Sequence, residues 1–225
     1  MNIDEKEPTN PLRDRFVLSK GHCSPALYAV LAERGYFDKN RLSEFRNVNG
    51  ELQGHPDMNK VPGVDMTTGS LGQGLSVANG MALTSKLNHD GYRVYCLVGD
   101  GEIEEGQIWE AAMSSYKYKL DNLCVIVDNN NLQIDGKITD VKGLDNIEGK
   151  FKAFGFKTIV IDGNNMEQII DAFDTAKLTK GVPTAVIAKT TKGKGVSYME
   201  NQAGWHGKAP NEEEYNKAME DLDRG

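Results

Sequence analysis

YRVYCLVGDG (residues 92–101) and LCVIVDNNN (residues 123–131) are two apolar runs that each end in a polar turn. Between them, apolar residues at 102–119 recur near helical spacing, which predicts an amphipathic helix. Strands whose apolar residues run continuously, and which alternate with helices, are typical of parallel sheets covered on both faces. The two runs therefore predict neighbouring parallel strands joined by a helix.

Working outward, the same reasoning predicts further elements on either side of this pair. FKTIVI (156–161) and PTAVIAK (183–189) indicate two more strands, and residues 166–178 between them indicate a helix. SPALYAVLAERG (24–35) predicts a helix with Ser24 as its N-cap, and SVANGMALTSKL (76–87) predicts another. We expect an α/β fold: a doubly wound, mostly parallel sheet with helices on both faces.

The domain prediction follows from the absence of repeats and of low-complexity linkers. We expect one domain over residues 1–225, which begins with an irregular segment at 1–14 and ends in a helical tail at 211–225. A chain of 225 residues is long enough to bury a sizeable core.

Composition excludes several classes of function. With 39% hydrophobic residues, 26% charged residues and a net charge of −7, the chain is an ordinary globular protein without a basic nucleic-acid surface. No apolar run approaches the roughly 20 residues of a membrane helix, and the charged start is no signal peptide. The three cysteines, Cys23, Cys96 and Cys124, lack CxxC spacing, so we expect a cytoplasmic protein without a thiolate metal site.

The polar turns at 99–101 and 129–132 are where chemistry is expected, because ligands bind beyond the carboxyl ends of parallel strands. Twenty-seven residues separate Gly101 from Asn129, enough for one helix and the next strand. Asp100 should therefore lie beside the second turn. Carboxylate, amide and carbonyl oxygens suit Mg²⁺ or Ca²⁺, with a polyphosphate supplying further oxygens.

GDG followed by NN at this interval resembles the metal–diphosphate motif of thiamine-diphosphate enzymes. Within those enzymes, the resemblance is to the N-terminal domain of the transketolase family and spans residues 15–210. The motifs that carry it, in order, are RDRFVLSKGH, GHPD, PGVDMTTGSLGQGLSVANGMA, GDGEIEEGQIWEA, DNNNLQIDG and GWHGKAP. The resemblance implies the thiamine-diphosphate-binding fold, a diphosphate-binding domain, and ketol transfer in the pentose phosphate pathway.

The resemblance also implies a metal site. Asp100, the Asn130 side chain and the Leu132 carbonyl match the metal ligands, with Mg²⁺, or Ca²⁺ or Mn²⁺, as the ion. Gly101 would offer its amide to the diphosphate, and Asn129 would support the turn.

Three of the four histidines match functional positions of the family. His22 and His206 resemble the two histidines that contact the diphosphate, and His55 resembles one that contacts a hydroxyl of the donor sugar. We expect all three to serve catalysis, with His55 and His206 orienting substrate. His89 and the basic loop at 190–195 are expected to be solvated.

The remaining matches concern the rings of the cofactor and a contact between chains. Gly69 and Leu71 resemble residues that line the aminopyrimidine, and Ile134 matches an apolar contact to the thiazolium ring. Acidic residues that include Glu102 are expected to interact favourably with a helix N-terminus, although a second metal site is an alternative. Glu105 resembles a glutamate at the dimer interface.

The resemblance leaves two parts of the family's site unaccounted for. The activating glutamate belongs to a separate pyrimidine-binding domain, for which 225 residues leave no room. We therefore expect a split enzyme, in which the partner is a C-terminal transketolase subunit, with self-association and a two-plus-two assembly. The family's first helices, which carry an SGHPG segment, have no match here, so we expect exposed apolar surface that they would cover.

Three other functions remain open from the sequence. A related enzyme of the deoxyxylulose-phosphate synthase type shares the GDG and NN elements. A regulatory subunit that binds the cofactor but is catalytically impaired is a second alternative. A dinucleotide-binding domain is a third, although no GxGxxG follows the first strand.

Overall fold

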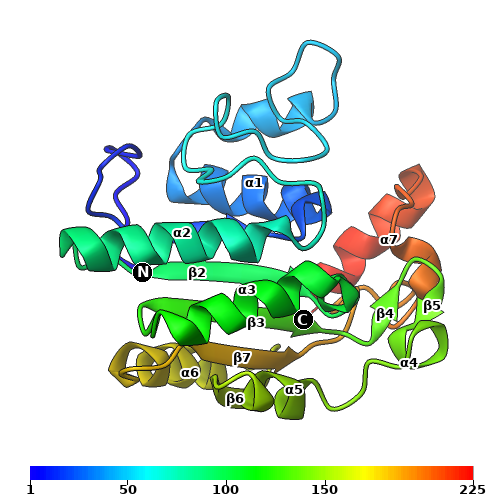
Figure 1. Ribbon diagram of the computed structural model, residues 1–225. Coiled ribbons are helices and arrows are strands. Elements are labelled where there is room, and N and C mark those ends of the chain that lie inside the picture. Colours follow the sequence, from blue (N-terminus) through cyan, green and yellow to red (C-terminus); the bar gives the residue numbers. More distant parts are fainter. Residues whose placement is uncertain (225) are drawn as a thin grey trace.

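The computed structural model describes residues 1–224 and is built on a five-stranded sheet in which every neighbouring pair is parallel. The strand order is β1-β2-β3-β7-β6 (Figure 1). These strands are β1 (Arg15–Leu18), β2 (Val94–Gly99), β3 (Leu123–Asn129), β6 (Lys157–Asp162) and β7 (Thr184–Lys189). The predicted α/β fold is confirmed. Gly225, the last residue of the predicted domain and tail, lies outside the described residues.

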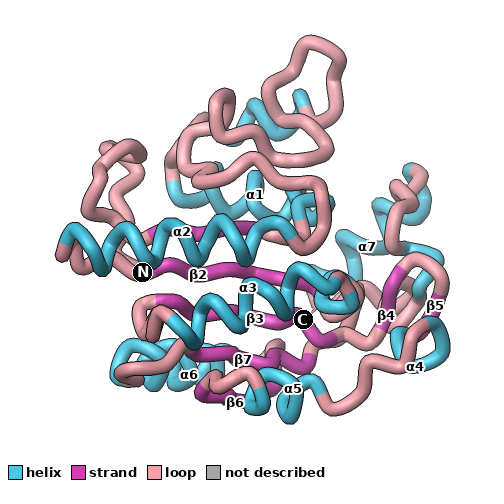
Figure 2. Tube along the Cα trace, viewed as in Figure 1, coloured by secondary structure: helices cyan, strands magenta, loops and turns pink. Residues whose placement is uncertain are grey.

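Helices and a small hairpin fill the connections between the strands (Figure 2). The α-helices are α1 (Ser24–Arg34), α2 (Gln73–Asn88), α3 (Gly106–Lys117), α4 (Ile138–Val141), α5 (Ile147–Ala153), α6 (Met166–Leu178) and α7 (Glu212–Asp223). The hairpin pairs β4 (Leu132–Gln133) with β5 (Gly136–Lys137). Four 3-10 helices are η1 (Gly21–Cys23), η2 (Lys39–Glu44), η3 (Glu102–Glu104) and η4 (Ala203–Trp205).

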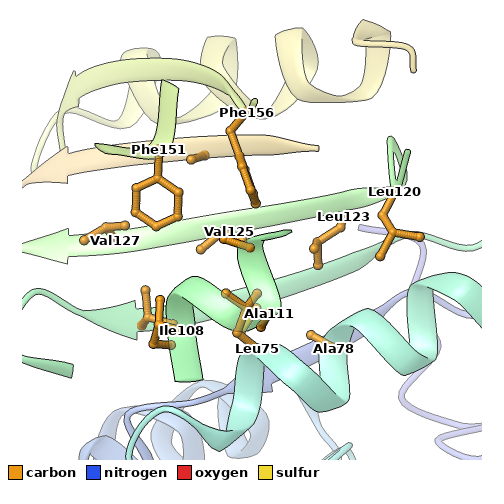
Figure 3. Packing of buried hydrophobic residues seen from close by; sticks show 14 of the residues in the cluster. Leu75, Ala78, Ile108, Ala111, Leu120, Leu123, Val125, Val127, Phe151 and Phe156 are labelled. Carbon is orange, nitrogen blue, oxygen red and sulfur yellow. The ribbon is translucent and has the colours of Figure 1, made fainter. Parts of the chain in front are cut away.

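One face of the sheet is closed by α2, α3 and α5. Leu75 of α2, Ile108 of α3 and Phe151 of α5 pack with Val125 of β3 in a single cluster of buried apolar side chains (Figure 3). All four are fully buried. This packing fixes the strands against the helices and so holds the strand ends in place.

The opposite face is covered by α6, which packs on the β6, β7 and β3 side of the sheet. Between α1 and the sheet lies an apolar groove of about 420 Å³, whose floor includes Phe16, Leu18 and Leu97. Val30 of α1 lines the same groove and is 59% exposed. This face of the sheet therefore carries an apolar groove beside α1.

Two local predictions differ from the structure, and one strand of the main sheet was not predicted. The short strand β1 was not predicted, because four residues are too few for a periodic pattern. The helix expected over 102–119 is broken at Glu105, whose backbone is extended between η3 and α3. Ser24 is the first residue of α1 and not its N-cap, because its hydroxyl donates to the Gly54 carbonyl at 2.8 Å.

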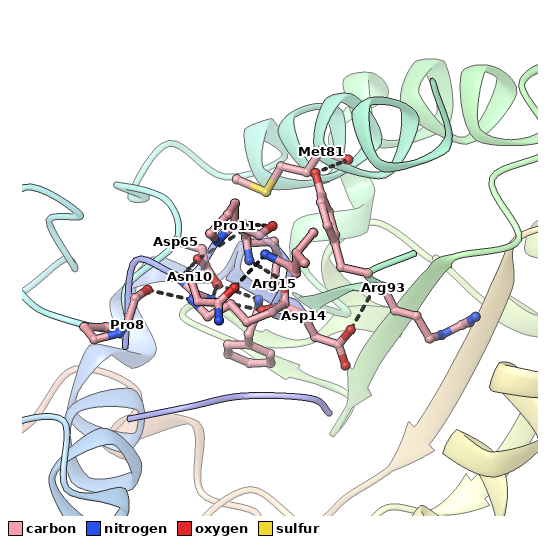
Figure 4. A network of polar contacts seen from close by, with 12 residues as sticks. Pro8, Asn10, Pro11, Asp14, Arg15, Asp65, Met81 and Arg93 are labelled. Atoms are coloured by element: carbon pink, nitrogen blue, oxygen red, sulfur yellow. Dashed lines mark hydrogen bonds and ion pairs between the residues drawn. The ribbon is translucent and has the colours of Figure 1, made fainter. Parts of the chain in front are cut away.

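The N-terminal segment is fastened to the sheet edge by two buried acids (Figure 4). Asp65 forms an ion pair with Arg13 and accepts from the Phe16 amide at 2.8 Å. Asp14 accepts from the Arg93 amide at 2.8 Å. These bonds set the position of β1 beside β2.

None of the helices within residues 1–224 is long and apolar enough to cross a membrane. The β4–β5 hairpin, α4 and α7 lie beyond one end of the sheet, on the right in Figure 1. That end carries the polar turns singled out from the sequence.

Candidate functional site

Asp100 lies at the end of β2 and is 2% exposed. One carboxylate oxygen accepts from the Gly101 amide at 2.9 Å. The other accepts from the Asn131 amide at 2.5 Å and from the Asn129 side chain at 3.2 Å. The two turns thus meet side by side, as the spacing of the strands predicted. Burial raises the pKa of the Asp100 carboxyl above its usual value, although these hydrogen bonds oppose the shift.

The carboxylate of Asp100 has no cationic partner within ion-pair distance among residues 1–224. A buried carboxylate without a counter-charge is costly, and a bound cation would relieve that cost. Within the same residues, no group of three or more His, Cys, Asp and Glu side chains is placed to hold a metal. A metal here would need amide, carbonyl and ligand oxygens besides the single carboxylate.

Asn130 and Leu132 form the second half of this arrangement. Asn130 is buried, and its side-chain oxygen accepts from the Leu132 amide at 3.0 Å, which closes a tight turn. Asn131 has a positive φ of 60°, a conformation that asparagine tolerates. The turn therefore keeps the Asn130 amide and the Leu132 backbone beside Asp100.

A group of basic side chains lies next to these acids. Lys20, 6% exposed, pairs with Asp128 at 2.6 Å, and Thr190 donates to the same carboxylate. Burial alone would lower the pKa of Lys20, but Asp128 outweighs it and the pKa of Lys20 is raised. Burial acts to raise the pKa of Asp128, yet Lys20 brings it below its usual value.

His22 and His206 stack on one another with ring centroids 5.2 Å apart. Burial, followed by Lys20, His206 and Lys192, lowers the pKa of His22 to about 4. Burial, Lys192 and Lys20 also lower the pKa of His206. The Nδ1 atom of His206 is buried and has no hydrogen-bond partner in the described part of the chain. Four basic groups crowded together form a place where an anion would be favoured.

His55 is exposed, and it lies close enough to His22 to contribute to the lowering of the pKa of that histidine. Its ring packs against Gly69, where an added Cβ would meet the imidazole at 3.2 Å. Gly69 has a φ of 157°, so a side chain there would be strained as well as crowded. The structure thus brings His55 and Gly69 together.

Leu71, Ile134 and Glu105 lie at the margin of the site. The Leu71 carbonyl accepts from the Gln107 side chain at 2.8 Å, which ties the loop before α2 to α3. Ile134 is 72% exposed at the tip of the β4–β5 hairpin, and Glu105 is also exposed. Neither Ile134 nor Glu105 contacts the turn of Asp100 through a hydrogen bond among residues 1–224.

The C-terminal helix α7 supports the loop that carries His206. Tyr198 donates to the Glu214 carbonyl at 2.6 Å, and Ser197 donates to Asp221 through both its amide and its hydroxyl. Tyr198 also packs on Trp205, the neighbour of His206. The tail is therefore part of the framework that places one of the stacked histidines.

Sequence reasoning missed three residues of this region. Glu102 was expected to interact with a helix dipole, but it is 3% exposed and receives hydrogen bonds from three other segments. Lys20 lies inside the KGH motif, and its position at a strand end was the available signal. Lys192 belongs to the loop expected to be solvated, yet it is half-buried and lowers the pKa values of both stacked histidines.

Comparison with known proteins identifies the family to which the chain belongs. Residues 1–223 match the family model described as transketolase, thiamine diphosphate binding domain. The chain belongs to the transketolase family.

Relatives of this transketolase-family chain include components of split enzymes. The chain is 44% identical, over 99% of its length and 79% of the relative's, to one subunit of the apulose-4-phosphate transketolase of Phocaeicola vulgatus. It is 44% identical, over 82% of the relative's length, to a 6-deoxy-6-sulfo-D-fructose transketolase subunit of a Clostridium species. It is 46% identical to human transketolase over 92% of its own length but only 33% of the human protein.

Solved structures agree with this assignment. Transketolase from Campylobacter jejuni superposes with a TM-score of 0.92 at 35% identity, over 99% of this chain and 36% of that protein. The chain thus spans about four-fifths of the split-subunit relatives and about a third of the single-chain transketolases. Family membership makes it a member of a group of thiamine-diphosphate-dependent transferases.

Proposed function

We propose that this chain is the diphosphate- and metal-binding subunit of a transketolase, which transfers two-carbon ketol units between sugar phosphates. The observation that carries the proposal is the buried carboxylate of Asp100, which forms no ion pair among residues 1–224 and lies near a group of four basic side chains, Lys20, His22, Lys192 and His206. A divalent metal complexed with a diphosphate would satisfy both at once, because it brings a cation to the acid and an anion to the bases. When bound, thiamine diphosphate supplies a carbanion-stabilising centre for making and breaking carbon–carbon bonds next to a carbonyl.

The proposed metal ligands are Asp100, the side-chain oxygen of Asn130 and the backbone carbonyl of Leu132, with Mg²⁺, Ca²⁺ or Mn²⁺ as the ion. Oxygen donors of these kinds match the preferences of hard divalent cations. A cation on Asp100 would compete for the oxygen that now accepts from the Gly101 amide. That exchange would release the Gly101 N–H to donate to a phosphate oxygen.

The proposed diphosphate contacts are Gly101, His22 and His206. A neutral imidazole beside a polyanion gains affinity for a proton, so both histidines could then donate from both nitrogens. The unpartnered Nδ1 atom of His206 supports this role. His22 and His206 would also face the reacting end of the cofactor, where His206 is proposed to help orient substrate.

The proposed ring contacts lie further from the metal. Gly69 and Leu71 would line the aminopyrimidine, and Ile134 would pack on the thiazolium ring. His55 would orient the donor sugar by a hydrogen bond to a hydroxyl next to the carbonyl, which is a positioning contribution to the rate. The contact between His55 and Gly69 supports placing both on one side of the cofactor.

We infer that the active enzyme needs a C-terminal transketolase subunit, which would supply the pyrimidine-binding domain and the activating glutamate. The names of the split-subunit relatives support this inference. The exposed Ile134 supports it too, since a large apolar side chain gains free energy when a partner removes it from water. We propose a single binding domain over residues 1–225 that self-associates and works in the cytoplasm.

The test combines this chain with the C-terminal subunit of its own organism and measures ketol transfer between sugar phosphates. Activity should require both chains, thiamine diphosphate and a divalent metal, and it should disappear when the metal is removed with a chelator. Ketol transfer by this chain alone would contradict the need for a partner. Cofactor binding without transfer in the mixture would favour the alternative of a catalytically impaired, regulatory subunit.

A further inference from the structure

Glu102 is a buried acid that the proposed cofactor contacts leave unused. Its side chain is 3% exposed and lies two residues beyond Asp100, in η3 (Glu102–Glu104). None of the ion pairs formed by residues 1–224 includes it. A carboxylate in such a place is stabilised only by the hydrogen bonds that it accepts.

Three segments far apart in the sequence donate those hydrogen bonds. One oxygen of Glu102 accepts from the Gly72 amide at 2.9 Å and from the Ser19 hydroxyl. The other oxygen accepts from the Gly99 amide at 3.0 Å. A single side chain therefore joins the end of β1, the loop before α2 and the end of β2.

The two backbone donors lie on opposite halves of the proposed cofactor site. Gly99 immediately precedes Asp100, at the metal and diphosphate end. Gly72 immediately follows Leu71, in the loop that begins at Gly69 and is proposed to line the aminopyrimidine. Because each oxygen holds one of these amides, the length of the carboxylate sets the separation between the two ends.

We propose that Glu102 is a positioning residue that fixes the distance between the metal-binding turn and the aminopyrimidine loop. This inference rests on the proposed function, because it assumes that the cofactor spans both segments. The hydrogen bonds that assemble the metal turn itself come from Gly101, Asn129 and Asn131 and do not involve Glu102. Loss of Glu102 should therefore disturb the spacing of the two ends more than the metal turn.

The discriminating substitution is Glu102→Gln. An amide has one acceptor oxygen, so it can satisfy the Gly72 amide or the Gly99 amide, but not both. The unsatisfied N–H is buried, and one of the two segments must move to find water or another partner. The side chain keeps its size, which limits the change in packing.

The experiment measures, by calorimetry with Mg²⁺ present, the affinities for thiamine diphosphate and for inorganic pyrophosphate. Both are measured for this chain alone and for this chain with its C-terminal subunit. Pyrophosphate reaches only the metal end, whereas thiamine diphosphate reaches both. Glu102→Gln should weaken the affinity for thiamine diphosphate by about 10- to 100-fold and the affinity for pyrophosphate by less than about 5-fold. Glu110→Gln, an exposed position on α3, should leave both affinities unchanged.

If Glu102→Gln weakens both affinities equally, or weakens neither, Glu102 does not have the proposed positioning role. If the unmodified protein binds neither ligand in a Mg²⁺-dependent way, the proposed function itself fails, and the inference fails with it. Should Glu102→Gln not fold, Glu102→Asp decides, because it keeps both acceptor oxygens but shortens the side chain that joins the Gly72 and Gly99 amides. Glu102→Asp should lower the affinity for thiamine diphosphate relative to pyrophosphate by about 3- to 10-fold, and an unchanged ratio contradicts the proposal.

Discussion

The two ends of the candidate site differ in how completely they are built. At the end proposed to bind the metal (the metal end), Asp100 and Asn130 are buried, and each is fixed by hydrogen bonds to the backbone. At the other end, His55 and Ile134 are exposed, and Ile134 is 72% accessible. The first end is held by the parallel sheet, while the second is held by loops.

This difference has a physical origin. The metal end lies at the carboxyl ends of β2 and β3, whose apolar residues are locked between layers of helices. The exposed end depends on the loop before α2 and on a two-residue hairpin. We therefore expect the metal end to be preorganised in the isolated chain and the other end to be completed by a partner subunit. Each of the following predictions tests one side of this comparison.

The largest effect is expected for Asp100→Ala. The substitution removes the only carboxylate proposed to bind the metal, so Mg²⁺-dependent affinity for thiamine diphosphate should fall by more than about 100-fold, from loss of a charged ligand. The fold should be retained in the absence of metal, because removal of a buried acid without an ion-pair partner offsets the loss of the hydrogen bonds that it accepts. Calorimetry with and without Mg²⁺ measures the affinity, with Asp135→Ala, an exposed acid on the neighbouring hairpin, as the control. An unchanged Mg²⁺-dependent affinity for thiamine diphosphate would contradict the proposal that Asp100 binds the metal.

The proximity of Asp100 to the 129–132 turn was predicted from the sequence better than the rest of the site, for reasons that particular residues make clear. Asp100 and the 129–132 turn each follow a long apolar strand. Neighbouring parallel strands place their carboxyl ends at the same edge of the sheet, so the residues that follow them lie close together. Glu102 could not be placed, because its three donors come from segments that only the folded chain brings together. Likewise, the burial of Lys192 depends on a loop whose path α7 fixes, and no local pattern encodes it.

The next largest effect is expected for Gly69→Ala, at the exposed end. A methyl group there would approach the His55 ring at 3.2 Å and would need a strained backbone at φ 157°. Ketol transfer should fall by roughly 10-fold, since a displaced histidine orients substrate poorly. Affinity for Mg²⁺ and pyrophosphate should stay within about 2-fold, because the metal end is not touched. Gly80→Ala on α2, where an added Cβ meets nothing, is the matched control. Loss of pyrophosphate binding would show that the two ends are not independent.

A smaller effect is expected from pH, through the stacked histidines between the two ends. The pKa of His22 is about 4 in the folded chain, below its ordinary value of 6.5. Between these values the unfolded chain binds a proton that the folded chain does not, so stability should fall as pH drops from about 6.5 to about 4. His22→Asn should reduce this pH dependence in denaturant titrations, whereas substitution of the exposed His89 by Gln should not. A bound diphosphate should raise the pKa of His22, so the protein should take up protons when the diphosphate binds at pH 6. The binding enthalpies measured by calorimetry in two buffers with different ionisation enthalpies should then differ.

The smallest effect is expected for Ser24→Ala, which removes a single tether of the exposed end. The Ser24 hydroxyl donates to the Gly54 carbonyl at 2.8 Å, one residue before His55. Its loss should cost about 1 kcal/mol of unfolding free energy, the usual net value of one hydrogen bond. If the exposed end is as loosely held as its accessibility indicates, ketol transfer should also fall by about 2- to 5-fold, a range that corresponds to roughly 0.4–1 kcal/mol. Ser43→Ala, whose hydroxyl bond lies within η2, is the control for a lost hydroxyl. A loss of stability with full activity would mean that Gly69, and not Gly54, positions His55. The preorganised part of the site would then include His55.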